Sequence, residues 1–434
     1  MVLPQDLITE ILLRLPVKSL VRFKSVCKSW LFLISDPRFA KSHFELAAAL
    51  ADRILFIASS APELRSIDFN ASLHDDSASV AVTVDLPAPK PYFHFVEIIG
   101  SCRGFILLHC LSHLCVWNPT TGVHKVVPLS PIFFNKDAVF FTLLCGFGYD
   151  PSTDDYLVVH ACYNPKHQAN CAEIFSLRAN AWKGIEGIHF PYTHFRYTNR
   201  YNQFGSFLNG AIHWLAFRIN ASINVIVAFD LVERSFSEMH LPVEFDYGKL
   251  NFCHLGVLGE PPSLYAVVGY NHSIEMWAMK EYKVQSSWTK SIVISVDGFA
   301  IRSFFPVCST KSGDIVGTNV IPGLMKCNDK GELQELRTYC DSPYPSEVAV
   351  YTESLFSLPC DSKSESVLPI SAMIRTMLCI APDSKFAHVT PLAQPPPHHR
   401  HTIIASPSKC ANQSLRLPTL AQPQPLRLHA FAAS

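Results

Sequence analysis

The sequence predicts a multidomain α+β protein with a small three-helix unit at the N-terminus, a large, mostly antiparallel all-β domain and a disordered tail. Apolar residues recur at helical spacing in residues 1–45. Short β-type runs separated by turn residues fill residues 46–358. Residues 359–434 lose both patterns. We therefore expect domain boundaries near residues 45 and 358.

The composition describes a chain that is able to bury a large core. Its 434 residues include 36 basic and 36 acidic side chains, and 48% of them are apolar. Binding to nucleic acid or to an anionic membrane through bulk charge requires a concentrated basic surface. The apolar runs are also too short, or too interrupted by charge, to span a bilayer. We therefore expect neither nucleic acid nor a membrane as a partner.

The first residues and the cysteines indicate the compartment. Residues 1–6 contain neither a basic segment nor an uninterrupted apolar one, so they predict no secretory leader. We therefore expect a cytoplasmic and/or nuclear protein whose 14 cysteines are reduced thiols, most of them buried as small apolar residues. No C-x-x-C pair suggests a zinc ribbon or a redox dithiol.

Three short helices are expected before residue 45. The first carries apolar residues at helical spacing from Leu7 to Leu15, and Pro16 ends it. The second begins after Pro16, and the third runs through Trp30 toward Pro37. Units of this size bury too small a fraction of their surface to be stable alone. We therefore expect an apolar face that a partner covers.

A weak repeat runs through the β-rich zone. In each unit an aromatic residue at a strand end is followed by a polar turn, as at Trp117, Phe175, Phe229 and Trp277. The intervals of roughly 50 residues are a little longer than those of four-stranded propeller blades, which leaves room for loop insertions. Six or seven such blades would fill the zone.

The last zone is rich in Pro, Ser, His and Ala. No acidic residue occurs between Phe386 and Ser434. Such a composition rarely closes a core, so we expect residues 359–434 to form a disordered tail.

The N-terminal helices closely resemble the F-box. The resemblance rests on the order and spacing of Leu3-Pro4, Ile11-Leu12, Leu15-Pro16-Val17-Lys18-Ser19-Leu20 and Val26-Cys27-Lys28-Ser29-Trp30. It implies docking on a Skp-family adaptor and, through it, on cullin and RING subunits. The alternative is a helical unit packed wholly on its own β domain. By similarity, with some of these residues forming the internal core instead, the adaptor contacts are Leu3, Pro4, Leu7, Ile8, Ile11, Leu12, Leu15, Pro16, Leu20, Val26, Cys27 and Trp30.

The β-rich zone looks like the F-box-associated domain of plant F-box proteins, often described as kelch-like. The matching segments are residues 100–105, 116–122, 146–156, 208–216 and 277–290. The resemblance implies a kelch-like β-propeller. Two of these segments, 118–122 and 150–155, carry turn chemistry that joins adjacent strands. We expect the tryptophans of this zone to pack between blades rather than to form ligand cages: Trp117, Trp182, Trp214, Trp277 and Trp288.

The sequence gives little indication of a metal site or of a catalytic site. His109, Cys110, His113 and Cys115 have a spacing that a metal site might use, but alternate residues of a strand point to opposite faces, so these side chains would not converge. The sequence contains no G-x-S-x-G elbow, Walker loop, H-E-x-x-H motif or G-x-G-x-x-G motif. We therefore expect no metal, no cofactor and no catalytic residue.

The two resemblances together imply the substrate-recognition subunit of an SCF-type cullin-RING ubiquitin ligase. In that function the helices bind the adaptor and the β domain binds a target protein for ubiquitination. The sequence leaves the identity of the target unknown, because binding loops follow no family motif. Two alternatives remain open: a propeller that binds a protein or small ligand outside any ligase, and an enzyme built on the propeller.

Overall fold

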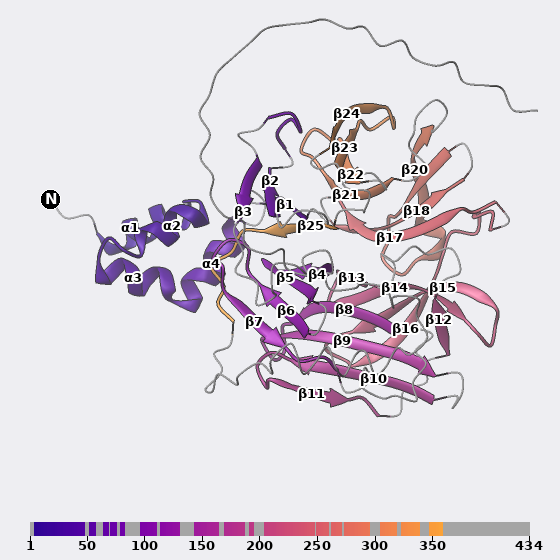
Figure 1. Cartoon of the computed structure of the whole chain (residues 1–434), viewed down its shortest axis with the longest axis horizontal. Coiled ribbons are helices and arrows are strands. Elements are labelled where there is room, and N and C mark those ends of the chain that lie inside the picture. Colours follow the sequence, from indigo (N-terminus) through magenta and orange to yellow (C-terminus); the bar gives the residue numbers. More distant parts are fainter. Residues whose placement is uncertain are drawn as a thin grey trace, which may run out of the picture. The chain divides into compact units, whose positions relative to one another are not determined.

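We describe a computed structural model of the chain (Figure 1). The predicted disordered tail, 359–434, and the predicted adaptor contact Leu3 lie outside the described residues. The structure describes residues 4–47, 52–57, 64–68, 70–75, 79–82, 96–110, 113–130, 143–164, 169–186, 191–194, 204–247, 249–259, 262–270, 273–295, 304–318, 323–338 and 347–358.

Four helices form the N-terminal module, where three were predicted. The third predicted helix ends before Asp36, and a fourth helix begins at Pro37. Pro37 suits the first helical position, where no partner for a backbone N–H is needed. Asp36 caps this fourth helix, because its side chain accepts a hydrogen bond from the backbone N–H of Arg38 at 2.8 Å. That hydrogen bond is the main cause of a lowered pKa at Asp36. The helices are α1 (Gln5–Leu13), α2 (Val17–Phe23), α3 (Lys28–Ser35) and α4 (Pro37–Ala47).

The module has a small core to which the far end of the chain contributes. Leu355, which follows the last strand of the β domain, packs into this core, and Phe356 packs against it. The phenyl ring of Phe44 on α4 lies 5.0 Å from that of Phe356. The helices are therefore completed by residues that come more than 300 positions later in the sequence. The helical residues of the core are Leu12, Val17, Leu20, Ile34, Phe39 and Ala40.

The described β strands form six antiparallel sheets. From the innermost strand outward, the first is β25 (Glu347–Thr352), β1 (Asp52–Ile57), β2 (Leu64–Ile67) and β3 (Ser79–Val82). The second is β4 (Glu97–Cys102), β5 (Phe105–Cys110), β6 (His113–Trp117) and β7 (His124–Val127). The third is β8 (Leu143–Asp150), β9 (Asp155–Asn164), β10 (Ala169–Ser176) and β11 (Ala181–Gly184).

The other three sheets follow the same plan. The fourth has β12 (Tyr192–His194) and β13 (Ser206–Leu208), both paired with β14 (Ala211–Arg218), then β15 (Ile223–Asp230) and β16 (Ser235–His240). The fifth is β17 (Phe252–Leu258), β18 (Ser263–Gly269), β19 (Ser273–Met279) and β20 (Trp288–Ser295), with the short helix η4 (Gln285–Ser287) before β20. The sixth is β21 (Phe305–Ser309), β22 (Ile315–Thr318), β23 (Gly323–Cys327) and β24 (Leu333–Thr338).

The six sheets close into a ring. Contacts between innermost strands run from β4 to β8, β13, β17, β21 and β25 in turn, and β25 contacts β4 again. The ring is sealed within one blade, because the late strand β25 pairs with the early strand β1 from Asp52↔Thr352 to Ile57↔Glu347 (Figure 1). The chain is therefore a six-bladed β-propeller, which decides between the six or seven blades that the repeat predicted.

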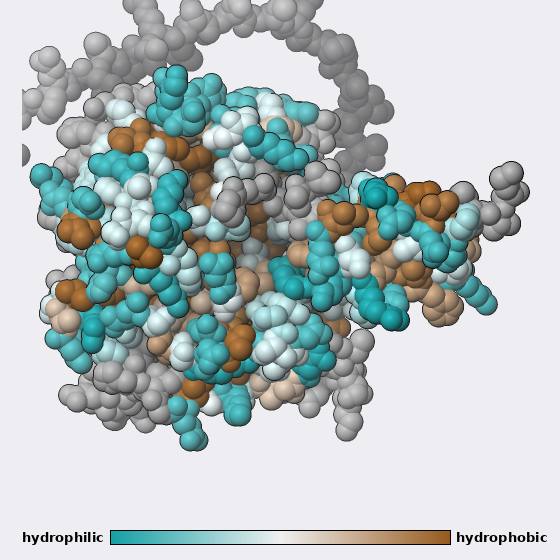
Figure 2. Space-filling model, turned by 180° about the vertical axis from the view of Figure 1, so that it is seen from behind, coloured by the Kyte–Doolittle hydropathy of each residue, from teal (hydrophilic) through white to brown (hydrophobic). Residues whose placement is uncertain are grey.

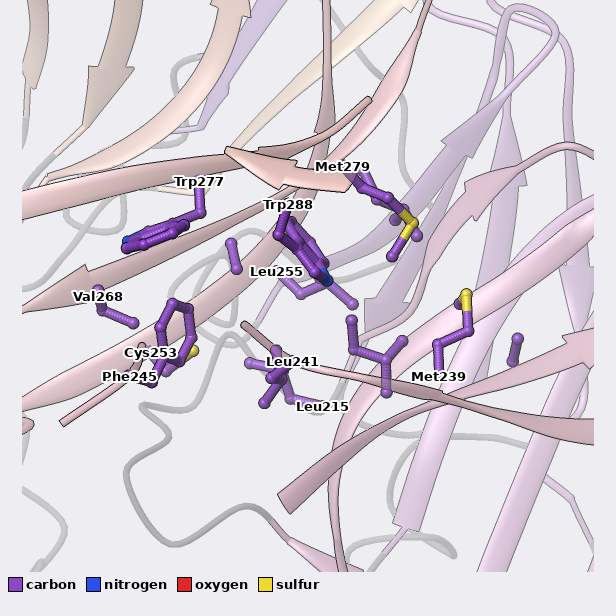
Figure 3. Close-up of a cluster of buried hydrophobic side chains, with 14 of the residues drawn as sticks. Leu215, Met239, Leu241, Phe245, Cys253, Leu255, Val268, Trp277, Met279 and Trp288 are labelled. Carbon is purple, nitrogen blue, oxygen red and sulfur yellow. The ribbon is translucent and has the colours of Figure 1, made fainter. Parts of the chain in front are cut away.

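Each boundary between neighbouring blades has its own apolar core. In the core between the fourth and fifth blades, Trp277 lies against Phe245, while Trp288 and Met279 lie on the side of Leu241 and Met239 (Figure 3). A separate cluster joins Phe56 of the first blade to Val316 of the sixth. Apolar side chains are therefore buried between neighbouring blades rather than within one blade, so each blade is stabilised by its contact with the next.

The turn chemistry expected from the sequence is confirmed at both motifs. The Asn118 side-chain oxygen accepts hydrogen bonds from the N–H groups of Thr120 and Thr121 at 2.9 and 3.3 Å, and Gly122 takes a positive φ of 77°. In the second motif the Asp150 carboxylate accepts the N–H of Ser152 at 2.8 Å. In both motifs, hydrogen bonds that a side chain accepts from backbone N–H groups two or three residues away thus stabilise the turn that joins adjacent strands.

Candidate functional site

The helical module presents an apolar surface to solvent. Leu7 and Ile11 lie one helical turn apart on α1, and each is 51% exposed. Their neighbours Ile8 and Leu15 are half-buried and pack against the module core. Figure 2 shows hydrophobic residues gathered on the surface of this module. Because the core of the module is already filled, this face has no apolar cover within the described residues.

Residues around the junction of α2 and α3 extend the surface. Val26 is 60% exposed and Cys27 is also exposed. Leu31 is exposed too, and Phe32 is 73% exposed, although neither was predicted. Leu31 and Phe32 lie off the face of α3 that carries Trp30 and Ile34 and packs toward the module core. An aromatic residue on the polar side of a short helix was the signal that could have identified Phe32.

Two of the residues predicted as adaptor contacts belong to the internal core that is also expected among them. Leu12 and Leu20 are buried in the core of the module, with 1% and 0% of their surfaces exposed. They lie one position away from exposed neighbours, Ile11 and Val21, because a helix turns successive residues to different sides. In this conformation their side chains are not available to a partner.

The remaining predicted contacts are distributed over the module surface. Pro4 and Pro16 are exposed and stand immediately before α1 and α2. Trp30 is half-buried, and its ring lies 5.4 Å from that of Phe23. The nearby pair of Glu10 and Arg14, 3.1 Å apart, is solvent-exposed and contributes little to stability. The structure thus brings Leu7, Ile11, Val26 and Cys27 to the surface as predicted, and nothing in it tests their binding to an adaptor.

The propeller has two unlike ends. One, which we call the connector face, is the end at which the last strand of a blade finishes and the first strand of the next begins, as at Val127 and Leu143 or at His240 and Phe252. The other, the hairpin face, carries the short turns that follow each innermost strand, such as 103–104 and 209–210. Antiparallel strands place these two kinds of connection at opposite ends of a blade.

The hairpin face adjoins the helical module. Arg103, in the turn between β4 and β5, places its guanidinium 4.1 Å from the centre of the Tyr149 ring, 5.0 Å from Phe356 and 5.6 Å from Phe44 of α4. Cation–π contacts of this kind stabilise by about 0.5–2 kcal/mol each. Part of the hairpin face is therefore occupied by the chain's own aromatic residues.

The connector face carries an exposed apolar residue of its own. Val243, in the connection between β16 and β17, is 80% exposed. Below this face, a hollow of about 270 Å³ lies among the innermost strands and is lined by His254, Phe305 and Glu347. Burial lowers the pKa of His254 to about 4, so the imidazole is neutral at pH 7.

The propeller tryptophans serve the scaffold. Trp117, Trp214, Trp277 and Trp288 are buried, which confirms the prediction for these four, and the half-buried Trp182 packs against Phe175 with ring centres 5.4 Å apart. Three indole N–H groups donate across a blade boundary to a backbone carbonyl oxygen, at 2.9–3.0 Å: Trp182 to Pro128, Trp214 to Cys145 and Trp288 to His240.

The described residues offer no metal site. His113, Cys110 and Cys115 are all buried on β5 and β6, whereas His109 is half-exposed and pairs with Glu97 at 3.2 Å. Within the described part of the chain, no three His, Cys, Asp or Glu side chains are grouped to hold a metal ion. Across the same residues, every helix is too short or too polar to cross a lipid bilayer.

Comparisons with known proteins agree with the two-part architecture. Residues 2–42 match the F-box domain, and residues 53–322 match the F-box associated beta propeller domain. The F-box protein CPR1 of Arabidopsis thaliana is 30% identical over 313 residues, which cover 67% of this chain and 73% of that protein. The F-box/kelch-repeat protein At3g23880 of the same plant is 30% identical over 303 residues, covering 67% and 79%. The chain therefore belongs to the family of F-box proteins with an F-box-associated β-propeller domain.

Proposed function

We propose that the chain is the substrate-recognition subunit of an SCF-type cullin-RING ubiquitin ligase, located in the cytoplasm and/or nucleus. The F-box would bind a Skp-family adaptor, and cullin and RING subunits would join through that adaptor. One observation carries the proposal: Leu7 and Ile11 are exposed side by side on an F-box whose own core is complete. Burial of such residues in a partner's groove concentrates binding free energy in a few side chains.

The target protein would bind at the connector face. The hairpin face is partly occupied by Phe44 and Phe356, whereas the connection between β16 and β17 carries the exposed residue Val243. Loops held by a rigid scaffold are the usual place for recognition. The chain would contribute no catalytic residue, because a tethered target lysine already meets the ubiquitin carrier at high effective concentration.

Adaptor binding by the purified full-length chain tests the proposal. We expect Leu7→Asp with Ile11→Asp to weaken binding to a Skp-family adaptor by roughly 100-fold or more, since two apolar contacts would be replaced by charges. The control is Val232→Asp with Val284→Asp, which introduces the same two charges at exposed apolar positions of the propeller and should leave binding unchanged. Leu12→Asp is unsuitable, because it would place a charge in the module core.

Circular dichroism and thermal melting confirm that each variant is folded before binding is compared. If the wild-type chain binds no Skp-family adaptor, or if the double variant binds as tightly as wild type, the ligase proposal is wrong. A propeller that acts outside any ligase would then be the better explanation.

Target binding is tested separately by proximity labelling in plant cells treated with a proteasome inhibitor. A target is expected to be labelled by the wild-type chain and by the Leu7→Asp, Ile11→Asp double variant, but less by Val243→Asp. A target whose labelling and abundance respond to none of these changes would contradict binding at the connector face.

A further inference from the structure

Two cysteines face each other across the third blade. Cys162 on β9 and Cys171 on β10 are direct partners in the antiparallel register, so their side chains lie on the same face of the sheet. Directly opposed residues of an antiparallel pair have Cα atoms about 4.5–5.5 Å apart, which is within the range of about 4.4–6.8 Å that a disulfide requires. The backbone therefore already holds this pair at bridging distance.

The two thiols differ in their access to solvent. Cys171 is exposed, whereas Cys162 is buried. Burial is the main reason why the pKa of Cys162 is raised to about 12, and the neighbouring Cys171 thiol and Glu173 carboxylate act in the same direction. Cys171 is therefore the thiol that meets a reagent from solution, and Cys162 stands behind it as a second thiol.

The other described cysteines lack this combination. Cys110 and Cys115 lie on paired strands, but their register partners are His113 and Leu108, and both thiols are buried. Cys27 is exposed on the helical module, away from any strand pair. Among the described residues, the register sets only Cys162 and Cys171 face to face.

We propose that Cys162 and Cys171 form an oxidisable dithiol, a reversible modification site at which hydrogen peroxide produces a cross-strand disulfide. The sulfur of Cys171 attacks one peroxide oxygen, the O–O bond breaks, and the departing hydroxide takes the thiol proton and becomes water. The sulfur of Cys162 then attacks the Cys171 sulfenic acid, an S–S bond forms, the S–O bond breaks, and a second water leaves with the Cys162 proton. The dithiol loses two electrons and two protons, which the peroxide gains.

The site lies where the third blade meets the connector face. Cys162 is also opposite Leu143, the first residue of the innermost strand β8, so the bond would form at the end where the chain enters this blade. A disulfide there would tie β9 to β10 beside the connection 165–168. The proposal goes beyond the ligase function and stands whether or not the chain binds an adaptor.

Peptide mapping of the full-length protein tests the proposal. The folded, reduced chain is treated with hydrogen peroxide, its remaining thiols are blocked with N-ethylmaleimide, and it is digested with trypsin. Cleavage after Lys166 separates the two cysteines, so a disulfide appears as peptide 167–178 joined to peptide 137–166, and fragment ions assign the bond to Cys162 rather than to Cys145, which lies in the same peptide. We expect this linked product to be the main cysteine modification and dithiothreitol to reverse it fully.

Two variants and one unfolded control sharpen the result. With Cys162→Ser, we expect the Cys171 sulfenic acid to persist and to be trapped by dimedone; with Cys171→Ser, the Cys162 peptide should stay unmodified. Unfolding in urea before oxidation should abolish the preference for this pair. Recovery of both cysteines as separate alkylated peptides after peroxide treatment of the folded chain, or preferential linkage of either one to another cysteine, would overturn the proposal.

Discussion

The side-chain nitrogen of Asn118 lies 3.1 Å from both the carbonyl oxygen and the hydroxyl oxygen of Ser354, a residue 236 positions later. The same nitrogen is 3.3 Å from the carbonyl oxygen of Phe356. Asn118 is fully buried, so it both shapes its own turn and holds the segment that leads from the propeller into the helical core. One amide therefore ties the second blade to the segment that leads from β25 to the core of the F-box.

Replacing Asn118 with Ala should destabilise the chain by about 2 kcal/mol, because buried carbonyl groups of the 354–356 segment would lose their donor. Urea unfolding at pH 7 measures the change. Thr121→Ala in the same turn is the control, and we expect it to cost less than about 0.5 kcal/mol. Equal losses in the two variants would show that Asn118 acts only through its turn.

Leu355→Ala should destabilise the F-box more than the propeller. Its side chain fills the core made by Leu12 and Leu20, so truncation would leave a cavity that costs about 3 kcal/mol. Hydrogen exchange should accelerate in α1–α4 and remain slow in β17–β20. Leu336→Ala removes the same atoms from a 42% exposed position and should change neither region. Unchanged exchange in the helices of the Leu355→Ala variant would mean that they are stable without this segment.

Arg234→Met should leave the buried Asp150 carboxylate without its charged partner, which lies 2.6 Å away. Burial raises the pKa of Asp150, but hydrogen bonds from Ser152 and Thr153 and the charge of Arg234 together hold it below its usual value. We expect a loss of about 2 kcal/mol at pH 7, measured by urea unfolding.

Arg178→Met provides the control for that experiment. Arg178 pairs with Asp154 at 2.9 Å, but both side chains are mostly exposed, so we expect a loss below about 1 kcal/mol. If Arg234→Met costs no more than this exposed pair, the link between the third and fourth blades contributes little.

His213 should make the chain sensitive to mild acid. Burial is the main reason why the pKa of His213 is lowered to about 4, and the charge of Lys283 lowers this pKa further. The Ser206 carbonyl oxygen, which accepts a hydrogen bond from the His213 Nδ1–H at 3.1 Å, acts in the opposite direction and raises the pKa. In the unfolded chain, the His213 imidazole binds a proton near pH 6.5, whereas in the folded chain it stays neutral down to about pH 4. The contribution of His213 to the free energy of unfolding is therefore complete above about pH 6.5 and is lost as the pH falls toward about 4.

The corresponding variant is His213→Gln, studied by urea unfolding at pH 7 and pH 5. Between these values, the stability of the variant should fall by about 2 kcal/mol less than that of the wild-type chain. An identical fall in both proteins would show that His213 does not become protonated on unfolding in this range. The variant also loses the 2.7 Å hydrogen bond to Tyr282, which lowers its stability at both pH values.

Local chemistry made several features predictable from the sequence. The proline-punctuated helices, the turns at Asn118 and Asp150 and the packing role of Trp214 follow from short-range rules: proline fixes φ, Asn and Asp bond nearby N–H groups, and aromatic residues in strands are buried. The F-box motif likewise predicts that Leu7 and Ile11 lie on an exposed face, and both are 51% exposed.

The tertiary structure alone decided what depends on long-range pairing. The six-blade count follows from which strands close the ring, the removal of Leu12 and Leu20 from the exposed surface follows from which side of each helix the core fills, and the Cys162–Cys171 pair follows from strand register. A shift of one residue in that register would turn these side chains to opposite faces. Sequence patterns specify periodicity, whereas register and ring closure are set by the apolar cores between blades, which join residues far apart in the chain.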